Sequence, residues 1–305
     1  MGFELIDTLT LAGDAAKANE DSSAHDLSAA VVLDGATPLG DGLMPGPSDA
    51  AWISHFGARR ILAHLRDGDG PRKALRAALA DTQKSFEALR RAAPQDVWQT
   101  PCASMMLATL SPSALRIASA ATGTSPAKSA DAQRGRGAED DLEFLWFGDC
   151  AALLKQGDGA VQIVGETLDK RAAEAGRAQK LAQEKGRPST DRAQFIDALR
   201  ATRNRINSGS YWLFSPDVNA ASHVSRRVIR CAPGAMLLLA SDGFLALASD
   251  YGAYSADTLM AAAQDKGLAA LGEELRAIEA GDAGGAKFPR FKTSDDATAL
   301  LLALV

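Results

Sequence analysis

The chain has 305 residues, of which 46% are hydrophobic and 23% are charged, so it is long enough to bury a large core. Its 38 acidic and 33 basic residues are mixed along the chain and give a net charge of −5, which excludes an electrostatic case for nucleic acid or an anionic membrane as a partner. The three cysteines, Cys102, Cys150 and Cys231, are widely separated and form no C-x-x-C pair, which favours free thiols in a reducing compartment over a structural zinc site.

The beginning of the chain lacks the features of a signal peptide. Glu4 and Asp7 occur where a signal peptide would have a basic head and an unbroken apolar run. Along the whole sequence no apolar stretch reaches membrane-spanning length. We therefore expect a cytoplasmic protein with no membrane partner.

The first half of the chain predicts strands, then two long helices, then strands again. Strands are expected at 3–11 and 27–33 from alternation and from β-branched valines. A helix is expected to begin at Ser48 or Asp49, both good N-caps, and a second helix covers about 72–91. Short apolar runs then predict an antiparallel meander with strands at 103–110, 114–120, 142–147, 151–155 and 160–164.

The second half predicts two surface segments and the remaining elements of the fold. Residues 121–141 are rich in small and charged side chains, so we expect a flexible hairpin extension, and 166–212 is expected to be a partly helical surface insertion near the functional site. Further strands are expected at 224–229, 235–240 and 297–305, and helices at 192–206, 258–263 and 268–280. No boundary divides the chain, so we expect a single domain over 1–305 in which packed sheets are covered by helices on both outer faces.

Acidic turns next to apolar, strand-like runs are the most informative feature of the sequence. Because carboxylates at the ends of buried strands are costly without a positive charge between them, convergence of these turns would create a site for hard cations. The segments are Asn19-Glu20-Asp21, Val31-Val32-Leu33-Asp34-Gly35, Ser241-Asp242-Gly243 and Ser294-Asp295-Asp296.

With the turn Gly148-Asp149-Cys150 added, the order of these motifs resembles the protein phosphatase 2C (PPM-type) family of metal-dependent serine/threonine phosphatases, of the bacterial type. The resemblance extends from residue 19 to residue 302. Each motif alone is common, but five motifs in the family order, each at a strand end, form a specific pattern. The resemblance implies an α+β fold with four α-β-β-α layers, in which two antiparallel sheets are flanked by helices.

The resemblance also implies a centre for two Mg²⁺ or Mn²⁺ ions. Asp34 matches the aspartate that bridges the two metals, and the carbonyl of Gly35 matches a backbone ligand. Asp242 and Asp295 match two further carboxylate ligands. On this basis Asp34, Asp242 and Asp295 are the residues expected to support catalysis.

Three other acidic residues are matched to the metal centre with alternatives left open. Glu20 and Asp21 match an acidic pair in which either member binds metal directly. Asp149 matches a residue that holds a third, weaker metal, and a structural turn at this position is an equally good interpretation.

The implied chemistry is hydrolysis of phosphoserine and phosphothreonine monoesters in a phosphorylated protein substrate, as in signalling. Mg²⁺ and Mn²⁺ prefer oxygen ligands, and two such ions activate a water for in-line attack on a phosphomonoester. No protein nucleophile is then required. In agreement, the four histidines are isolated, and the sequence contains no Gly-x-Ser-x-Gly, H-E-x-x-H or Cys-x5-Arg motif.

The chain departs from the family pattern at two positions. Ala16 stands where the family commonly has an arginine that holds the substrate phosphate, and the neighbouring Lys17 is the expected substitute, although a solvated lysine is a competing interpretation. Arg290, Lys292 and the arginines of 200–205 are further candidate cations. Ala36 stands where eukaryotic members have a histidine, a candidate general acid.

Two alternatives follow from these departures. A pseudophosphatase or regulatory binding module with the same fold and weak or no catalysis would explain Ala16 and Ala36, although every carboxylate ligand is retained. The run Leu33-Asp34-Gly35-Ala36-Thr37 also suggests a haloacid-dehalogenase-type phosphohydrolase, which ranks last because that chemistry needs an aspartate where this chain has Val32.

Overall fold

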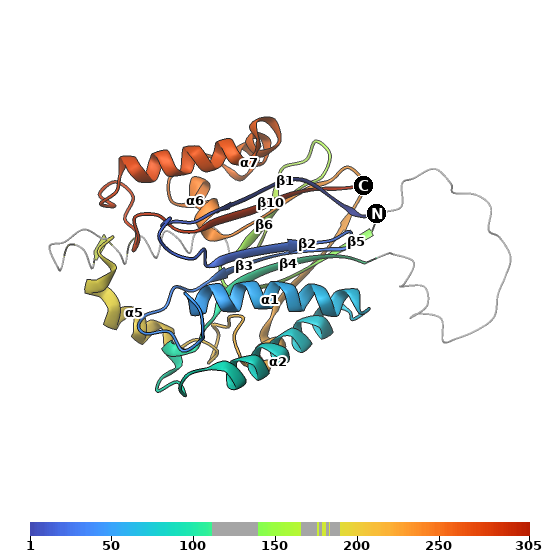
Figure 1. Cartoon of the computed structure of the whole chain (residues 1–305). Helices are drawn as coiled ribbons and strands as arrows, with labels where there is room; N and C mark the ends of the chain where they lie inside the picture. Colours follow the sequence, from blue (N-terminus) through green and yellow to red (C-terminus); the bar gives the residue numbers. More distant parts are fainter. Residues whose placement is uncertain (112–139, 166–175, 177–178, 181–182, 184–189) are drawn as a thin grey trace, which may run out of the picture.

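The computed structural model of the chain describes residues 1–111, 140–165, 176, 179–180, 183 and 190–305. Two five-stranded sheets pack face to face, and helices cover the outer face of each (Figure 1). Every pair of neighbouring strands is antiparallel. The four-layer arrangement expected from the sequence is confirmed.

The first sheet has the strand order β1-β10-β9-β6-β7. Helices α6 (Asp242–Ser249) and α7 (Ala256–Gly281) cover its outer face (Figure 1). The strands are β1 (Phe3–Leu11), β6 (Ala151–Lys155), β7 (Gln162–Gly165), β9 (Met236–Ala240) and β10 (Ala297–Leu304).

The second sheet has the strand order β2-β3-β4-β5-β8. Helices α1 (Asp49–Arg66) and α2 (Pro71–Leu89) cover its outer face (Figure 1). The strands are β2 (Asp21–His25), β3 (Ala29–Gly35), β4 (Ala103–Ser111), β5 (Asp140–Phe147) and β8 (Ser225–Cys231).

A short helical segment lies at one end of the sandwich. It consists of a 3₁₀ turn, η2 (Arg192–Phe195), followed by helix α5 (Ile196–Arg203). The two chain termini lie at the opposite end (Figure 1). Two further 3₁₀ turns are η1 (Val97–Gln99) and η3 (Val218–His223).

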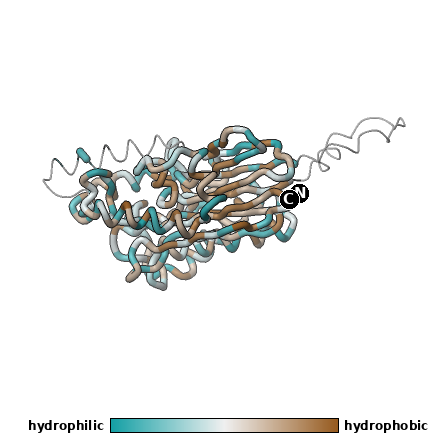
Figure 2. Tube along the Cα trace, turned by 90° about the horizontal axis from the view of Figure 1, so that it is seen from above, coloured by the Kyte–Doolittle hydropathy of each residue, from teal (hydrophilic) through white to brown (hydrophobic). Residues whose placement is uncertain are grey.

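The core consists of apolar layers above, between and below the sheets. Successive side chains of a strand point to opposite faces, so Val31 and Leu33 of β3 pack with α1 and α2, while Val32 packs between the sheets. Central strands buried on both faces need continuous apolar sequences. Figure 2 shows the resulting hydrophobic strands in the interior.

Three features differ from the expectation. The run of strands after α2 is no single meander, because β4 and β5 belong to the second sheet whereas β6 and β7 belong to the first. The chain changes sheets at Gly148-Asp149-Cys150, since β6 pairs with β9 and not with β5. Strand β2 and helix α6 were not predicted, because β2 is mostly polar and α6 continues an apolar run directly after β9.

Several of the expected elements lie in segments outside the described residues. The expected strand at 114–120 and nearly all of the hairpin extension at 121–141 lie outside the described residues, whereas residues 140–141 belong to β5. Most of the first half of the insertion at 166–212 also lies outside them. No helix in the described part of the chain combines the length and the apolar character that a membrane-spanning helix requires.

The two helices expected at 258–263 and 268–280 form one element with a break. Helix α7 covers both segments, and Gly267 between them has a non-helical backbone with φ of 82°. The next residue, Leu268, donates its backbone N–H to Asp7 Oδ2 at 2.7 Å. Strand β1 therefore contributes a carboxylate to the start of the second half of α7.

The crossover turn between the sheets gives a test of the fold. Gly148 has φ of 68°, and a Cβ there would lie 2.8 Å from Leu213 Cδ2 and would also meet Ser104 Oγ. We expect Gly148→Ala to destabilise the protein by about 1–2 kcal/mol for the left-handed backbone and by about 1–3 kcal/mol more for overpacking. Urea unfolding measures the loss.

Gly157→Ala is the matched control for this substitution. Gly157 also has a positive φ, of 53°, but a Cβ there would have no neighbouring atom within 4 Å. Its cost should therefore be the backbone contribution alone. Equal losses for the two variants would contradict the packing described at Gly148.

Candidate metal centre

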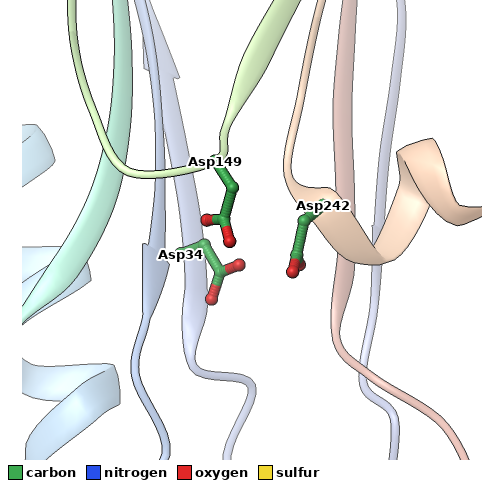
Figure 3. Close-up of side chains that lie close together, drawn as sticks. All are labelled: Asp34, Asp149 and Asp242. Carbon is green, nitrogen blue, oxygen red and sulfur yellow. The ribbon is translucent and has the colours of Figure 1, made fainter. Parts of the chain in front are cut away.

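Three carboxylates from distant parts of the chain meet between the two sheets. Asp34 lies near the end of β3, Asp149 in the turn between β5 and β6, and Asp242 at the start of α6 (Figure 3). One ligand oxygen from each residue can be chosen so that all three oxygens lie within 4.8 Å of one another. The structure thus brings together three of the residues that the sequence predicted as metal ligands.

The strand register around Asp34 adds further polar groups. Asp34 is directly opposite Asp21 on β2 and Ser104 on β4. Ser104 Oγ donates a hydrogen bond to Asp149 Oδ1 at 2.6 Å. A Cβ at position 35 would lie 2.7 Å from the carbonyl oxygen of Glu20, so only glycine lets the end of β3 approach the loop before β2 this closely.

Asp21 is the most deeply buried of these carboxylates. Its relative exposure is 2%. Oδ2 accepts a hydrogen bond from Ser241 Oγ at 2.7 Å, which links the two sheets, whereas Oδ1 has no hydrogen-bond partner among the described residues. A buried carboxylate oxygen without a donor is costly, and a bound cation would satisfy it.

Burial and mutual repulsion raise the pKa values of two of these groups. The pKa of Asp21 is raised well above its usual value, first by burial and then by the charges of Asp295, Asp296 and Asp242, against the opposing hydrogen bond from Ser241. The pKa of Asp34 is also raised well above its usual value, by removal from water and by Asp242, Asp21 and Asp295. The cluster therefore has too little positive charge for its carboxylates.

Asp295 interacts electrostatically with Asp21 and Asp34 and forms an ion pair with Lys292. Lys292 Nζ lies 2.6 Å from Asp295 Oδ1. Although burial opposes the shift, the charges of Asp295 and Asp34 raise the pKa of Lys292. Arg276 fixes the backbone here by donating to the carbonyl oxygen of Asp295 at 2.8 Å. Among the described residues, the ammonium group of Lys292 pairs with only one of the carboxylates. The negative charge that remains on the others suits oxygen ligands of divalent cations.

Glu20 and Asp296 are held by local hydrogen bonds. Glu20 accepts from Ser48 Oγ at 2.6 Å and from Thr37 Oγ1 at 2.5 Å. Asp296 accepts from the backbone N–H groups of Gly13 at 2.7 Å and Glu20 at 2.6 Å. These contacts tie the loop before β2 to the start of α1 and to the loop before β10.

Lys17, the predicted phosphate ligand, lies on the surface. Its side chain is 76% exposed, and Nζ lies 3.3 Å from Asp14 Oδ2. Lys17 is not among the residues that line the cavity at the carboxylate cluster. Arg290 does line this cavity, but its guanidinium donates to Asp282 Oδ2 at 2.9 Å and to the carbonyl oxygen of Asp282 at 2.6 Å.

The cavity beside the carboxylates has a volume of about 540 Å³ and combines three kinds of side chain. Asp34, Asp149, Asp242 and Asp295 provide acidic groups. Apolar groups include Phe195 and Phe291, which make an edge-to-face contact with ring centroids 5.5 Å apart. Cationic groups come from Lys180, Arg192, Arg203, Arg290 and Lys292.

The sequence analysis did not single out Arg192, and it treated Arg203 only as one of several arginines in a basic stretch. Both lie in the segment that was expected to be an insertion near the site. The alternation of basic and apolar residues in 192–206 was the available signal. That pattern is equally typical of a solvated helix face.

Cys150 directly follows Asp149 but is a poor nucleophile. Its thiol is fully buried. Burial, followed by the charges of Asp34 and Asp149, raises its pKa well above the usual value, so the thiol stays protonated at neutral pH. Cys150 is therefore part of the core between the sheets.

Solved structures with the same architecture include serine/threonine phosphatases. The chain is similar to the Mycobacterium tuberculosis serine/threonine phosphatase PstP/Ppp (TM-score 0.53, 16% identity, covering 100% of this chain and 99% of that chain). It is similar to PppA, described as a key regulatory component of T6SS in Pseudomonas aeruginosa (TM-score 0.51, 15% identity, covering 100% of this chain and 99% of that chain). It is also similar to the S. agalactiae serine/threonine phosphatase (TM-score 0.50, 14% identity, covering 99% of this chain and 100% of that chain).

These similarities confirm the predicted resemblance at the level of the fold, which is that of the protein phosphatase 2C enzymes. No protein-family model matches the sequence, and no curated protein matches it. At such low identity the activity has to be argued from the site itself.

Cation binding should be visible in the stability of the protein. We expect Mn²⁺ or Mg²⁺ to raise the melting temperature, by an amount equivalent to about 2.7 kcal/mol when the cation is present at 100 times its Kd. Asp34→Asn should raise the stability of the metal-free protein, because it removes a repelled charge, and should reduce the shift caused by the cation. Calorimetry with and without chelator measures both effects.

Asp265→Asn is the control, since Asp265 is exposed on α7 and distant in sequence from every predicted ligand. It should leave both the metal-free stability and the cation-induced shift unchanged. A wild-type protein whose melting temperature responds to neither cation would contradict the metal centre.

The raised pKa values predict the pH dependence of the metal-free protein. Because Asp21 and Asp34 have higher pKa values in the folded than in the unfolded chain, the folded state binds more protons at pH values above the usual carboxyl value of 3.8. Their contribution to stability should therefore fall as the pH rises from there through the raised values. Urea midpoints between about pH 5 and pH 8 should fall less steeply for Asp34→Asn. If the urea midpoints of wild type and Asp34→Asn fell equally with pH, ionised Asp34 would not destabilise the metal-free protein.

Proposed function

We propose that this chain is a metal-dependent protein phosphatase that hydrolyses phosphoserine and phosphothreonine monoesters. The observation that supports it most directly is the meeting of Asp34, Asp149 and Asp242, carried by both sheets, in a cavity that also contains cationic side chains. The fold shared with known serine/threonine phosphatases supports the same assignment.

The donor set suits divalent cations. Asp34, Asp242 and Asp295, together with the Gly35 carbonyl and either Glu20 or Asp21, would hold two Mg²⁺ or Mn²⁺ ions, and Asp149 would contribute to a third site. When bound, the two ions would activate a water molecule and offset the negative charge of the phosphoryl group.

The protein's own contribution is to fix the carboxylates before substrate arrives. Ser104 orients Asp149, and Ser241 orients Asp21. Asp34 is held in the ladder between β2 and β4, so its backbone has little freedom. Such preorganisation lowers the entropic cost of reaching a reactive geometry.

Histidine does not supply the proton to the leaving group in this proposal. Ala36 provides no acid, and none of the four histidines lines the part of the cavity that the structure describes. Water is the proton source that we propose. Because an alkoxide needs a proton more than an aryl oxide does, turnover of p-nitrophenyl phosphate should exceed turnover of a phosphothreonine peptide.

The activity test uses these two substrates. We expect no turnover with chelator and recovery with Mn²⁺ or Mg²⁺. Asp34→Asn and Asp242→Asn should each lower kcat/KM by more than the roughly 10–100-fold that is typical for loss of an outer-sphere partner. Asp265→Asn should behave as wild type. Turnover that persists without any divalent cation would rule out the mechanism.

The same experiment separates the enzyme from the alternative of a pseudophosphatase. That alternative predicts a protein that binds Mn²⁺, as a shift in melting temperature, and shows no turnover of either substrate. Metal-restored turnover that is lost in Asp34→Asn excludes it. The two functions therefore give different outcomes with the same preparations.

A further inference from the structure

Two arginines of the η2–α5 segment share one backbone carbonyl close to the carboxylate cluster. Arg192 Nη2 donates to the carbonyl oxygen of Thr37 at 3.1 Å, and Arg203 Nη1 donates to the same oxygen at 2.7 Å. Thr37 follows the end of β3, three positions after Asp34. The two guanidinium groups are thus held next to each other beside the predicted metal centre.

In the part of the chain that the structure describes, neither guanidinium group is neutralised by a direct ion pair, although the charges of Asp295 and Glu20 act on Arg192. Among the described residues, neither Arg192 nor Arg203 lies within ion-pair distance of a carboxylate. Burial, and then the charge of Arg203, lowers the pKa of Arg192. Two like charges that meet at a neutral carbonyl are unfavourable on their own, and an anion between them would reverse that balance.

The donors of this pair are only partly used. Within the described residues, Arg192 donates through Nη2 and Arg203 through Nη1. A guanidinium carries five N–H donors in a planar fork that matches the oxygens of a phosphate. Both side chains line the same cavity as Asp34, Asp149 and Asp242, so part of each side chain lies where a substrate would bind.

The segment that carries the arginines contacts the loop before β10. Phe195, at the end of η2, makes an edge-to-face contact with Phe291, which precedes Lys292. The charge of Arg192 acts on Asp295 and on Lys292. Arg192, Arg203 and Lys292 are therefore parts of one cationic group that faces the acidic cluster.

We propose that Arg192 and Arg203 form the subsite that binds the phosphate group of a phosphomonoester substrate. They take the place of the arginine that the family has at the position of Ala16, and they come from a different part of the chain. The inference rests on the proposed function for the identity of the ligand. Lys17 and Arg290 are less suited, since the first lies outside the cavity lining and the second is engaged by Asp282.

Inorganic phosphate is the probe, because its binding does not require turnover. Calorimetric titration of the Mn²⁺-loaded protein should give a phosphate Kd that rises about tenfold or more in Arg192→Gln and in Arg203→Gln, the loss of a charged hydrogen-bonding partner. Arg205→Gln is the matched control, because Arg205 lies two positions after Arg203, is exposed and is not part of the cavity lining. It removes the same charge and should leave the Kd unchanged.

Two further measurements distinguish phosphate binding from support of the loop at Thr37. The Mn²⁺ affinity of both glutamine variants should equal that of wild type, and their KM for p-nitrophenyl phosphate should rise more than kcat falls. Arg203→Lys, which keeps the charge but loses the fork, should fold and show an intermediate phosphate Kd. It also serves as the test if a glutamine variant fails to fold.

An unchanged phosphate Kd in folded Arg192→Gln and Arg203→Gln, or in Arg203→Lys, would overturn the subsite. So would a loss of phosphate affinity in Lys17→Ala with none in the arginine variants. Absence of turnover in wild type would refute the proposed function without affecting the phosphate Kd. The two proposals therefore fail in separate measurements.

Discussion

Repulsion among carboxylates at one end of the sandwich is the constraint on which the site depends. Burial raises the pKa values of Asp21 and Asp34, and the nearby charge of Asp242 raises both further, because little water is left to screen these groups. A fold retains such an arrangement only when the surrounding packing overcomes its cost. Here the packing comes from both sheets, whose central strands are fully buried.

The link between the sheets is also a link within the site. Ser241 follows β9 of the first sheet. Its backbone N–H donates to the carbonyl oxygen of Thr298 on β10, and its hydroxyl oxygen accepts from the backbone N–H of Thr298. The same hydroxyl donates to Asp21 of the second sheet. A change in the separation of the sheets would therefore change the geometry of the carboxylates. This coupling helps to hold the charged side chains in place between the sheets.

The cavity separates two electrostatic tasks between different parts of the chain. Strand ends and the start of α6 supply the acidic groups that suit divalent cations, whereas the η2–α5 segment supplies the guanidinium groups that suit a phosphate. The acidic part is built on rigid elements of the sandwich. The cationic part is added from outside it, so substrate affinity can vary through that segment while the metal centre stays the same.

The sequence by itself determined the four layers, nearly all of the described strands, and the strand-end positions of Asp34, Asp149 and Asp242, because apolar periodicity and turn residues act locally. It did not determine strand β2, whose polar residues form a strand only because β3 offers them partners, or the division of β4–β7 between two sheets, which depends on pairing with β9. The position of Arg192 and Arg203 was also decided only by the tertiary structure. Their shared partner, the carbonyl of Thr37, is more than 150 positions away in the chain, and contacts at such separation leave no periodic signal in the sequence.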